Sequence, residues 1–466
     1  MPVWREPENL DRCWPKRLVI LRMVLSAGLA DRNHAWGQRT MTPKEDPREF
    51  LLHLFRTAVA SGDPESCLPR YLPPKPPGRA VVVGAGKAAA GMAKIIEAAW
   101  DGSISGLVVC PHGCSVPTRQ VEVVEASHPV PDEAGTRAAR RMISLVRGLS
   151  ENDLVVALIS GGGSALLTLP APALDLQDKQ AVTEKLLKSG AAIAEINCVR
   201  KHLSAIKGGR LAATAWPARV HALAISDVPG DDPSVIASGP TVADPTTSAD
   251  ALAVIERYGI AISDAMRQWL CDAASETPKI GDIRLSRSTF QFVSQPVDAL
   301  RAAAEEARAI GVQPLILGDS IEGEAREVGR VMAGIALSTV SSNMPVEPPC
   351  VLLSGGETTV TVRGTGTGGR NREFALSLAI ALAGRYDISA IACDTDGIDG
   401  APDAAGAFVL PDTIARALRK GLDPHLALAD NDAGGLFRRL GDQVVTGPTG
   451  TNLNDFRAIY VPGPSR

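Results

Sequence analysis

The stretch Leu158–Leu167, LISGGGSALL, places three glycines between two serines directly after the apolar run Leu154–Ile159. A short apolar run bounded by turn residues indicates a buried strand. Glycines at its end leave backbone N–H groups unobstructed by side chains, so this turn can bind an anion. A tight turn without a ligand explains the same glycines, and the surrounding sequence separates the two interpretations.

Apolar runs of four to six residues alternate with Ala- and Leu-rich helical patterns from residue 48 onward. This alternation predicts an α/β fold whose large domain is a doubly wound parallel sheet, covered by helices on both faces. The sequence predicts strands at Ala80–Val83, Leu107–Cys110, Leu154–Ile159, His221–Ile225 and Val312–Leu317, and helices at Lys87–Trp100, Asp132–Val146 and Val297–Ala309.

The pattern changes after the Pro- and Ser-bearing stretch Ser338–Pro349. Strands come with more turns and fewer helices there, which predicts a smaller mixed α/β domain. We therefore expect a large domain at 41–340 and a C-terminal domain at 341–466. The strands of the C-terminal domain are expected at Val351–Ser354, Thr358–Val362, Ser389–Cys393, Gln443–Thr446 and Arg457–Val461.

Residues 1–40 are expected to form an upstream extension outside the fold. Met41 opens the segment MTPKEDPREFLLHLF, which is typical of a protein start that leads into an amphipathic helix. A signal peptide at 17–30 is the less favoured alternative, because Arg22 interrupts the apolar run and the run is too short to span a bilayer.

Charge and cysteine usage exclude several classes of partner. The chain has 48 basic against 52 acidic residues, so no bulk charge favours nucleic acid or an anionic membrane. Its eight cysteines are scattered, which favours free thiols in a reducing cytoplasm. A metal site at Cys110, His112 and Cys114 is a less favoured alternative, since no second cysteine pair completes a zinc motif.

A second glycine-rich turn lies in Val81–Gly91, VVVGAGKAAAG. Gly84, Gly86 and Ala89 loosely match a dinucleotide-binding fingerprint, but the next strand ends without the acidic residue that would bind a ribose hydroxyl. Lys87 is predicted in the first turn of the following helix, where the helix dipole repels a cation unless an anion is bound. A solvated lysine is the alternative.

The third glycine-rich loop, Arg363–Phe374, places Arg370 and Arg372 in the first turn of a helix. The apolar segment Phe374–Leu382 predicts that this helix is buried, so two arginines at its positive end favour an anionic ligand. Beside these two loops, the cradle interpretation of Ser160–Ser164 is preferred.

Two acidic loops follow predicted strands. Ile225–Pro233 carries Asp227, Asp231 and Asp232, and Cys393–Gly400 carries Asp394, Asp396 and Asp399. Such carboxylates can hold Mg²⁺ or accept a proton from a hydroxyl, and turn-forming aspartates are the alternative.

Two further segments carry polar groups. Arg200, Ser204 and Lys207 share one face if Asn197–Arg210 is helical, and a solvated face is the alternative. The stretch Gly447–Asp455 is either a hairpin or a polar wall of the site.

Nine motifs, in order between residues 48 and 462, closely resemble the glycerate 2-kinase family, whose small C-terminal domain is known as MOFRL. They are Gly84-Ala-Gly-Lys87, Ser127-His-Pro129, Ser160-Gly-Gly-Gly-Ser164, Asn197-Cys-Val-Arg-Lys-His-Leu-Ser204, Ser226-Asp-Val-Pro-Gly-Asp231, Ser238-Gly-Pro-Thr241, Gly368-Gly-Arg-Asn371, Thr395-Asp-Gly397 and Gly447-Pro-Thr-Gly-Thr-Asn452.

The resemblance implies ATP- and Mg²⁺-dependent phosphorylation of D-glycerate at the 2-hydroxyl, giving 2-phosphoglycerate. It implies an active site in the cleft between two α/β domains and functional roles for Lys87 and Arg370, with Asp231 and Asp396 in the matching acidic loops. Some relatives are named hydroxypyruvate reductases, so an NAD(P)H-dependent reductase is the alternative, and a sugar-acid or nucleotide sensor is a third possibility.

The loops and the resemblance together assign the expected site. Only small molecules are expected as partners, and the chain is expected to be a monomer or homodimer. The expected catalytic residues are Lys87, Arg370, Asp231 and Asp396; phosphate is expected at Gly84, Gly86, Ser160, Gly161, Gly162, Gly163 and Ser164, substrate at Arg200, Lys207 and Asn371, and the metal at Asp227 and Asp394.

Overall fold

The computed structural model describes residues 43–172 and 174–463. The chain divides into Met1–Pro47 and Arg48–Arg466. Within the first unit, the described residues form a turn and the first residue of a helix. The extension expected at 1–40 lies outside the described residues.

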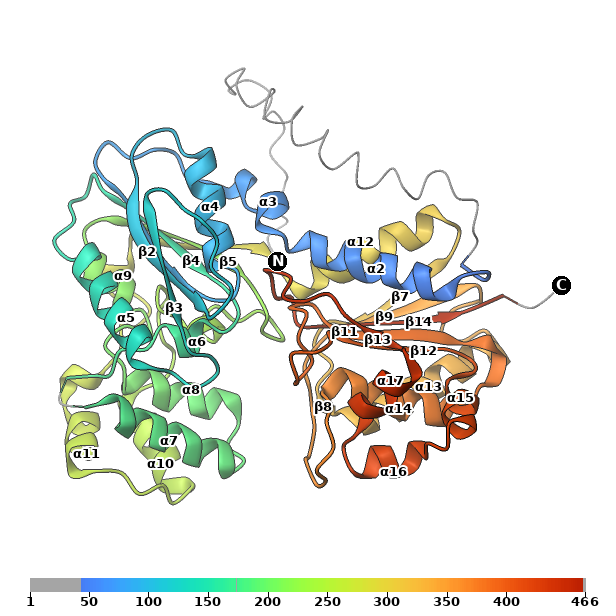
Figure 1. Ribbon diagram of the computed structural model, residues 1–466. Coiled ribbons are helices and arrows are strands. Elements are labelled where there is room, and N and C mark those ends of the chain that lie inside the picture. Colours follow the sequence, from blue (N-terminus) through green and yellow to red (C-terminus); the bar gives the residue numbers. More distant parts are fainter. Residues whose placement is uncertain (1–42, 173, 464–466) are drawn as a thin grey trace, which may run out of the picture. The chain divides into compact units, whose positions relative to one another are not determined.

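The first sheet has six strands in the order β3-β2-β1-β4-β5-β6, and all neighbouring pairs are parallel (Figure 1). Val82 packs on one face of this sheet with Met92, whereas Val81 and Val83 pack on the other with Met142. Both faces are therefore buried, as the continuous apolar runs predict. The strands are β1 (Ala80–Ala85), β2 (Ser105–Pro111), β3 (Val121–Ala126), β4 (Leu154–Ile159), β5 (Arg219–Ile225) and β6 (Ser288–Ser294).

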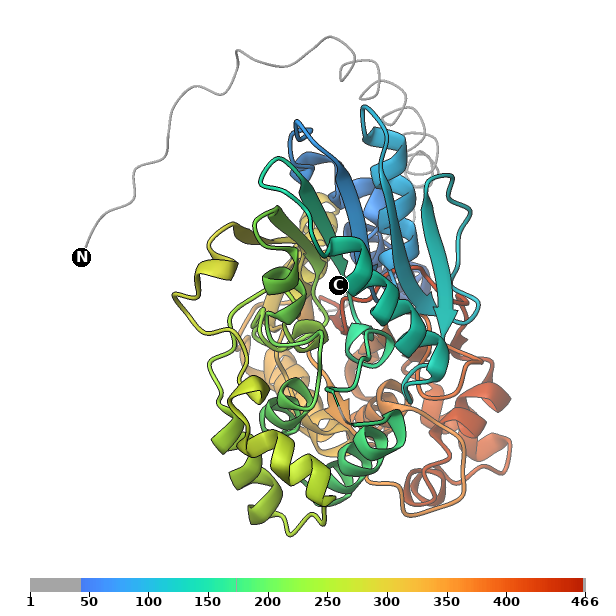
Figure 2. The same ribbon diagram turned by 90° about the vertical axis from the view of Figure 1, so that its left-hand side faces the viewer.

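Helices cover this sheet, and four of them form a separate layer around their own apolar cluster, which includes Val182, Leu186, Val199 and Ile255. These are α7, α8, α10 and α11, green to yellow-green in Figure 2, below the strands of the first sheet. The helices are α3 (Pro64–Cys67), α4 (Ala89–Ala99), α5 (Glu133–Val146), α6 (Gly163–Leu166), α7 (Leu176–Lys188), α8 (Ile193–His202), α9 (Arg210–Ala215), α10 (Ser248–Arg257) and α11 (Asp264–Cys271), with 3₁₀ turns η1 (Pro69–Tyr71), η2 (Ile236–Ser238), η3 (Ala273–Ser275) and η4 (Ile283–Leu285).

The second sheet is mixed and has the order β13-β12-β11-β14-β9-β7. β7 pairs parallel with β9, and the other neighbours pair antiparallel. A small parallel pair joins β8 to β10. The strands are β7 (Gln313–Gly318), β8 (Gly323–Glu324), β9 (Cys350–Ser354), β10 (Thr358–Thr359), β11 (Ser389–Asp394), β12 (Gly406–Val409), β13 (Gln443–Val444) and β14 (Asp455–Val461).

In Figure 1, α2 and α12 lie on one side of the second sheet and α13 to α17 on the other. The rings of Phe50 on α2 and Tyr460 on β14 pack edge to face with centroids 5.3 Å apart. The helices are α2 (Pro47–Ser61), α12 (Pro296–Ala309), α13 (Ala325–Ser342), α14 (Arg370–Leu382), α15 (Thr413–Arg419), α16 (Pro424–Ala429) and α17 (Ala433–Leu440), with the 3₁₀ turn η5 (Arg385–Asp387).

The predicted fold class, a parallel-sheet α/β domain with a mixed C-terminal domain, is confirmed. The predicted domain boundary at residue 340 stays a prediction. The change from the first sheet to the second, however, lies before residue 340, between β6 and β7. The strand predicted at Val312–Leu317 forms as β7 and belongs to the second sheet, and α2 packs there too. We call residues 64–294 the first lobe, and residues 48–61 with 296–463 the second lobe.

Candidate active site

The two glycine turns of the first lobe form one unit. β1 and β4 are paired so that Ala85 lies opposite Ile159, and both strands end there. The N–H of Lys87 donates to the carbonyl of Gly161 at 2.8 Å. The N–H of Ala88 donates to Ser160 Oγ at 3.0 Å. Gly86 has φ +143°, and a Cβ there would lie 2.1 Å from Ser160 Oγ, so only glycine fits against the second turn.

The Gly161–Ser164 turn presents several N–H groups. Gly162 takes φ +79°, and the N–H of Gly163 donates to the carbonyl of Ser160 at 3.1 Å. Within the described part of the chain, the N–H groups of Gly161, Gly162 and Ser164 have no acceptor. Successive N–H groups of this kind can bind an anion, so the predicted cradle is available.

Gly84 does not belong to this cradle. It lies inside β1, and a Cβ there would stand 2.2 Å from the carbonyl oxygen of Leu158 on β4. The close approach of two strand backbones therefore explains this glycine without a ligand, and its expected contact with phosphate stays a prediction.

Lys87 lies just before a helix rather than in its first turn, because α4 begins at Ala89. Its ammonium group forms an ion pair with Asp396, which follows β11 of the second lobe. Burial lowers the pKa of Lys87, but the carboxylates of Asp396, Asp394 and Asp227 together outweigh burial and raise it above its ordinary value. Lys87 therefore stays charged and connects the glycine turns to an acidic loop.

Asp227, which follows β5, lies at the same place. Its Oδ2 accepts a hydrogen bond from Asn452 Nδ2 at 2.8 Å, and its carbonyl accepts one from Asn454 Nδ2 at 2.8 Å. A Cβ on Gly161 would lie 2.1 Å from Asp227 Oδ2. Burial raises the pKa of Asp227 to about 6, although the charge of Lys87 opposes the shift. Loops that follow β1, β4, β5 and β11 thus meet with the loop that precedes β14.

The arginines of the third glycine-rich loop were predicted to bind a ligand anion, and this stays a prediction. Arg370 and Arg372 do occupy the first turn of α14, and that helix is buried as predicted. Their anionic partners, however, are carboxylates of the chain itself. Arg370 pairs with Asp455, Asp394 and Glu357, each at 2.8 Å, and Arg372 pairs with Asp399 and Asp403, each at 3.0 Å.

Electrostatics around Arg370 follow from these pairs. Burial lowers the pKa of Arg370, but Asp455, Asp394 and Glu357 outweigh it and raise the pKa above its ordinary value. Burial and the charge of Asp396 raise the pKa of Asp394 well above its ordinary range, and Arg370 acts in the opposite direction. Carboxylates outnumber cations here, so this side of the site attracts a cation.

A magnesium ion is compatible with this carboxylate set. No group of three or more His, Cys, Asp or Glu side chains among residues 43–172 and 174–463 is placed to hold a metal alone. Mg²⁺ in kinases binds one or two carboxylates together with substrate phosphates, and does not need such a group. Asp227 and Asp394, one from each lobe, are the carboxylates that would take part in such a shared site.

Two expected site residues are placed differently from the prediction. Asn371 is fully buried and donates from Nδ2 to Asp455 Oδ1 at 2.6 Å, and its expected contact with substrate stays a prediction. Asp231, at φ +51°, accepts a hydrogen bond from Gln295 Nε2 at 2.8 Å. The described structure records no contact between Asp231 and either Lys87 or Asp396, and Asp231 Oδ1 is buried without a donor.

The helical face predicted for Arg200, Ser204 and Lys207 does not form, because α8 ends at His202. Ser204 Oγ accepts hydrogen bonds from the N–H groups of Ile206 and Lys207, both at 3.3 Å, and thereby stabilises a turn. This turn carries Lys207 to the glycine cradle, where its ammonium group donates to the carbonyl of Ser164 at 2.7 Å.

Sequence reasoning missed four contributors to the site: Glu357, Asn452, Asn454 and Asp455. Glu357 lies outside any segment singled out above, whereas the other three lie in the polar stretch 447–455, for which a hairpin and a polar wall were both open. Since its asparagines hold Asp227 across the two lobes, the wall interpretation is the one that the contacts favour.

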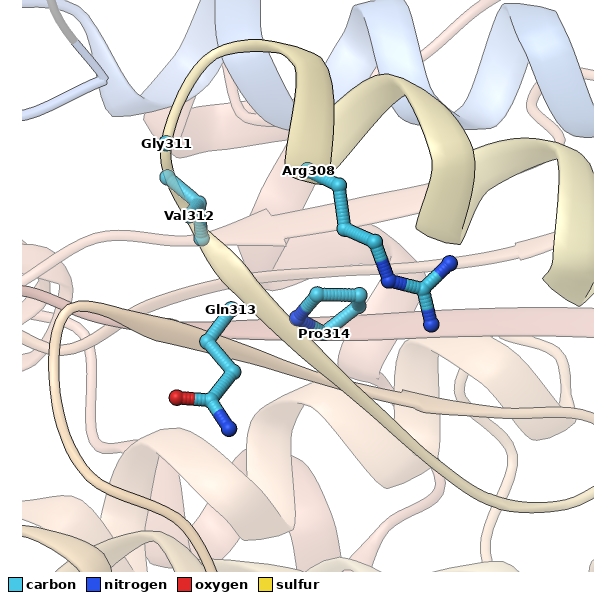
Figure 3. Close-up of a pocket in the computed structure, with 5 residues that line it drawn as sticks. All are labelled: Arg308, Gly311, Val312, Gln313 and Pro314. Atoms are coloured by element: carbon cyan, nitrogen blue, oxygen red, sulfur yellow. The ribbon is translucent and has the colours of Figure 1, made fainter.

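Other features of the molecule lie outside this site. A cavity of about 410 Å³ where α12 meets β7 is lined by Arg308 and by residues 311–314 (Figure 3). None of these side chains is a nucleophile or a carboxylate, so the cavity carries no catalytic chemistry. Over the described residues, no helix has both the length and the apolar character needed to cross a bilayer.

Comparison with known sequences supports one family for both lobes. Residues 50–271 match a family described as Domain of unknown function (DUF4147), and residues 350–455 match the MOFRL family. The chain is 41% identical over 417 residues to D-glycerate 2-kinase of Thermotoga maritima, an alignment that covers 89% of this chain and 98% of the relative. It is 34% identical to human glycerate kinase, over 89% of this chain and 93% of the relative.

One relative carries another name. A protein of Agrobacterium vitis, provisionally named hydroxypyruvate reductase, is 55% identical over 89% of this chain and 94% of its own length. The crystal structure of glycerate kinase from Thermotoga maritima superposes with a TM-score of 0.82 at 40% identity, covering 90% of this chain and all of that one. With this fold, and with both family matches on one chain, the protein belongs to the glycerate 2-kinase family and carries that family's MOFRL domain.

Proposed function

We propose that this protein transfers a phosphoryl group from ATP to the 2-hydroxyl of D-glycerate, with Mg²⁺, and releases 2-phosphoglycerate. The observation that carries the proposal is the convergence of Gly161–Ser164, Lys87, Asp227 and Asp396 at one place. Phosphoryl transfer requires such a combination, because catalysis consists of positioning and of neutralising charge on the transferred group. The names of the Thermotoga maritima and human relatives support the same activity.

Lys87 is assigned the charge that faces the transferred phosphoryl group. Its ammonium group now pairs with Asp396, and a phosphoryl group that binds there would take over part of that pairing. The N–H groups of Gly161, Gly162 and Ser164 would hold the nucleotide phosphates. Each of these groups is fixed before substrate binds, which is the condition for strong electrostatic stabilisation.

Arg370 is assigned a positioning role, because its guanidinium group already pairs with three carboxylates. It would hold Asp394 where that carboxylate, together with Asp227, binds the metal. Bound Mg²⁺ would neutralise phosphate charge. Asp231 is assigned as the acceptor for the proton of the glycerate hydroxyl, since its buried Oδ1 has no donor, and Asp396 orients Lys87.

The reductase alternative is weakened by the packing of the first turn. Gly84 packs on the Leu158 backbone and Gly86 on Ser160, so both glycines have a structural reason that needs no dinucleotide. A sensor would bind the same ligands without turning them over.

One assay separates these functions. The purified protein is incubated with D-glycerate, ATP and Mg²⁺, ADP release is followed, and the product is identified by phosphorus NMR. The proposal requires ADP and 2-phosphoglycerate in equal amounts. Oxidation of NADH with hydroxypyruvate, in the absence of ATP, would instead establish a reductase, and ligand binding without either product would establish a sensor.

A further inference from the structure

Three cations lie together in the helical layer of the first lobe. Lys179 is on α7, Arg200 is on α8, and Lys207 is in the turn before α9. Lys179 is 6% exposed and Lys207 is 1% exposed, while Arg200 is partly buried. We call these three residues the cation cluster.

The cation cluster has no carboxylate partner within residues 43–172 and 174–463. Lys207 donates to the carbonyls of Ser164 at 2.7 Å and Ala237 at 3.4 Å. The ammonium nitrogen of Lys179 is buried without any acceptor. No ion pair or hydrogen bond of the Arg200 guanidinium group occurs there. Buried charges are ordinarily paired, so such a group is expected to meet an anion.

Lys201, next to Arg200 on the same helix, shows how this fold treats a buried structural lysine. Its ammonium group pairs with Asp244 at 2.6 Å, and both side chains are buried. In contrast, burial, followed by the charges of Arg200 and Arg210, lowers the pKa of Lys179 to about 7. Burial, followed by Lys179 and Arg200, likewise lowers the pKa of Lys207. The cluster is thus a set of like charges whose repulsion a bound anion would relieve.

The cluster is joined directly to the glycine cradle. Lys207 contacts Ser164, and Ser164 Oγ is 2.8 Å from Ser238 Oγ, which in turn donates to Asn197 on α8. These contacts place the cation cluster at the end of the cradle in the first lobe. Asp227, in the acidic loop that follows β5, lies at the other part of the cradle, beside Gly161.

We propose that Lys179, Arg200 and Lys207 bind the carboxylate of the acceptor acid; this rests on the proposed glycerate kinase function. The acidic loops repel a carboxylate and attract a nucleotide that carries Mg²⁺. Lys87 and Arg370 are already paired with aspartates. The cation cluster is consequently the place where the carboxylate of a small 2-hydroxycarboxylic acid can form ion pairs. Lys179 would thereby determine the specificity for such acids.

The test uses Lys179→Met in the full chain, with Lys188→Met as matched control. Lys188 is on the same helix but exposed, and pairs with Glu184 at the surface. Calorimetry measures the binding of D-glycerate, of glycolate, of glycerol, which lacks the carboxylate, and separately of Mg–ATP. Lys179→Met should weaken D-glycerate and glycolate by about tenfold or more, because a hydrogen bond to a charged group is lost.

Lys179→Met should bind Mg–ATP as tightly as wild type does, and glycerol should bind to neither wild type nor Lys179→Met. Without ligand, Lys179→Met should have a melting temperature no lower than that of wild type, because the substitution removes one of three like charges. Unchanged D-glycerate affinity, or an equal loss of Mg–ATP affinity, would overturn the carboxylate site. If Lys179→Met does not fold, Arg200→Met is measured in the same way, because the Arg200 side chain makes no ion pair or hydrogen bond with any described residue.

Binding and turnover distinguish this proposal from the kinase function. If wild type and Lys179→Met both phosphorylate D-glycerate and have the same KM for it, the carboxylate site is refuted and the kinase function is retained. Wild type that binds D-glycerate through Lys179 but forms no phosphorylated product would refute the kinase function and retain the site.

Discussion

Replacing Asp455 with asparagine should destabilise the second lobe, because Asp455 is the buried carboxylate that joins two arginines. Arg457 Nη2 donates to Asp455 Oδ2 at 2.5 Å, and neither side chain is exposed. Arg370 Nε donates to Asp455 Oδ1 at 2.8 Å. Arg370 keeps Asp394 and Glu357 as partners after the change, whereas Arg457 loses the carboxylate with which it pairs.

The expected magnitude follows from that asymmetry. Breaking a buried ion pair by removing one partner costs about 3–5 kcal/mol, since the remaining charge stays buried. Asparagine preserves the shape of the side chain, so loss of packing contributes little. We therefore expect Asp455→Asn to lower the free energy of unfolding by about 3–5 kcal/mol. The kcat/KM should also fall, because Arg370 and Asp394 lose a fixed neighbour.

Urea unfolding followed by circular dichroism measures this loss. Arg457→Met combined with Asp455→Asn removes both charges, so the double variant should be more stable than the sum of the two changes predicts, by about 2 kcal/mol or more. Glu327→Gln, which removes an exposed partner of Arg330, is the control and should change stability by less than about 0.5 kcal/mol. A loss below about 1 kcal/mol for Asp455→Asn, or simple additivity in the double variant, would refute the reasoning.

Three further predictions concern the glycine cradle and the groups around it. Lys87→Met should lower kcat/KM by about 10²–10⁴-fold, and a variant that keeps more than about a tenth of wild-type kcat/KM would remove Lys87 from the proposed mechanism. Gly161→Ala should lower kcat/KM by about 10²-fold, because the added Cβ would lie 2.1 Å from Asp227 Oδ2 and 2.7 Å from Asn452 Nδ2. Gly334→Ala is the control and should keep full activity, because a Cβ at that position meets nothing within 4 Å. Burial raises the pKa of Asp227 to about 6. Between about pH 4 and 6 the folded protein therefore binds more protons than the unfolded chain. The contribution of Asp227 to the free energy of unfolding consequently falls as pH rises through that window. Without metal, Asp227→Asn should therefore match wild type near pH 4 and exceed its unfolding free energy by about 1–3 kcal/mol at pH 8, and a gap that does not change with pH would contradict this assignment.

The strand-end loops could be predicted because their signals are local. An apolar run followed by glycines or aspartates fixes both the strand and the position of its loop, and parallel strands bring these loops to one edge. Ser160–Ser164, Lys87 and Asp227 meet for that reason. Asp396 follows β11 of the second sheet and reaches them through its ion pair with Lys87.

The partners of Arg370 and Arg372 could not be predicted, because they are distant along the chain. Asp455 lies 85 residues beyond Arg370, and Asp399 lies 27 residues beyond Arg372. Only the antiparallel pairing of β11 with β14 brings Asp394 opposite Asp455 and thereby forms the carboxylate set. Two arginines at a helix start therefore do not distinguish a bound ligand from carboxylates of the same chain.

Two other features depended on tertiary structure. An apolar strand such as β7 does not specify which sheet it joins, and its pairing with β9 placed it in the second lobe. Lys179 stands in a helix whose sequence is typical of an amphipathic surface helix, so its burial becomes visible only when α8 packs against it.

A crystal structure with Mg²⁺, a non-hydrolysable ATP analogue and D-glycerate tests the central claim most directly. We predict that Lys87 Nζ lies within hydrogen-bond distance of the terminal phosphate, which in turn lies over the N–H groups of Gly161–Ser164. A structure in which both ligands are bound, Lys87 still pairs only with Asp396 and the phosphates lie away from this loop would contradict the account.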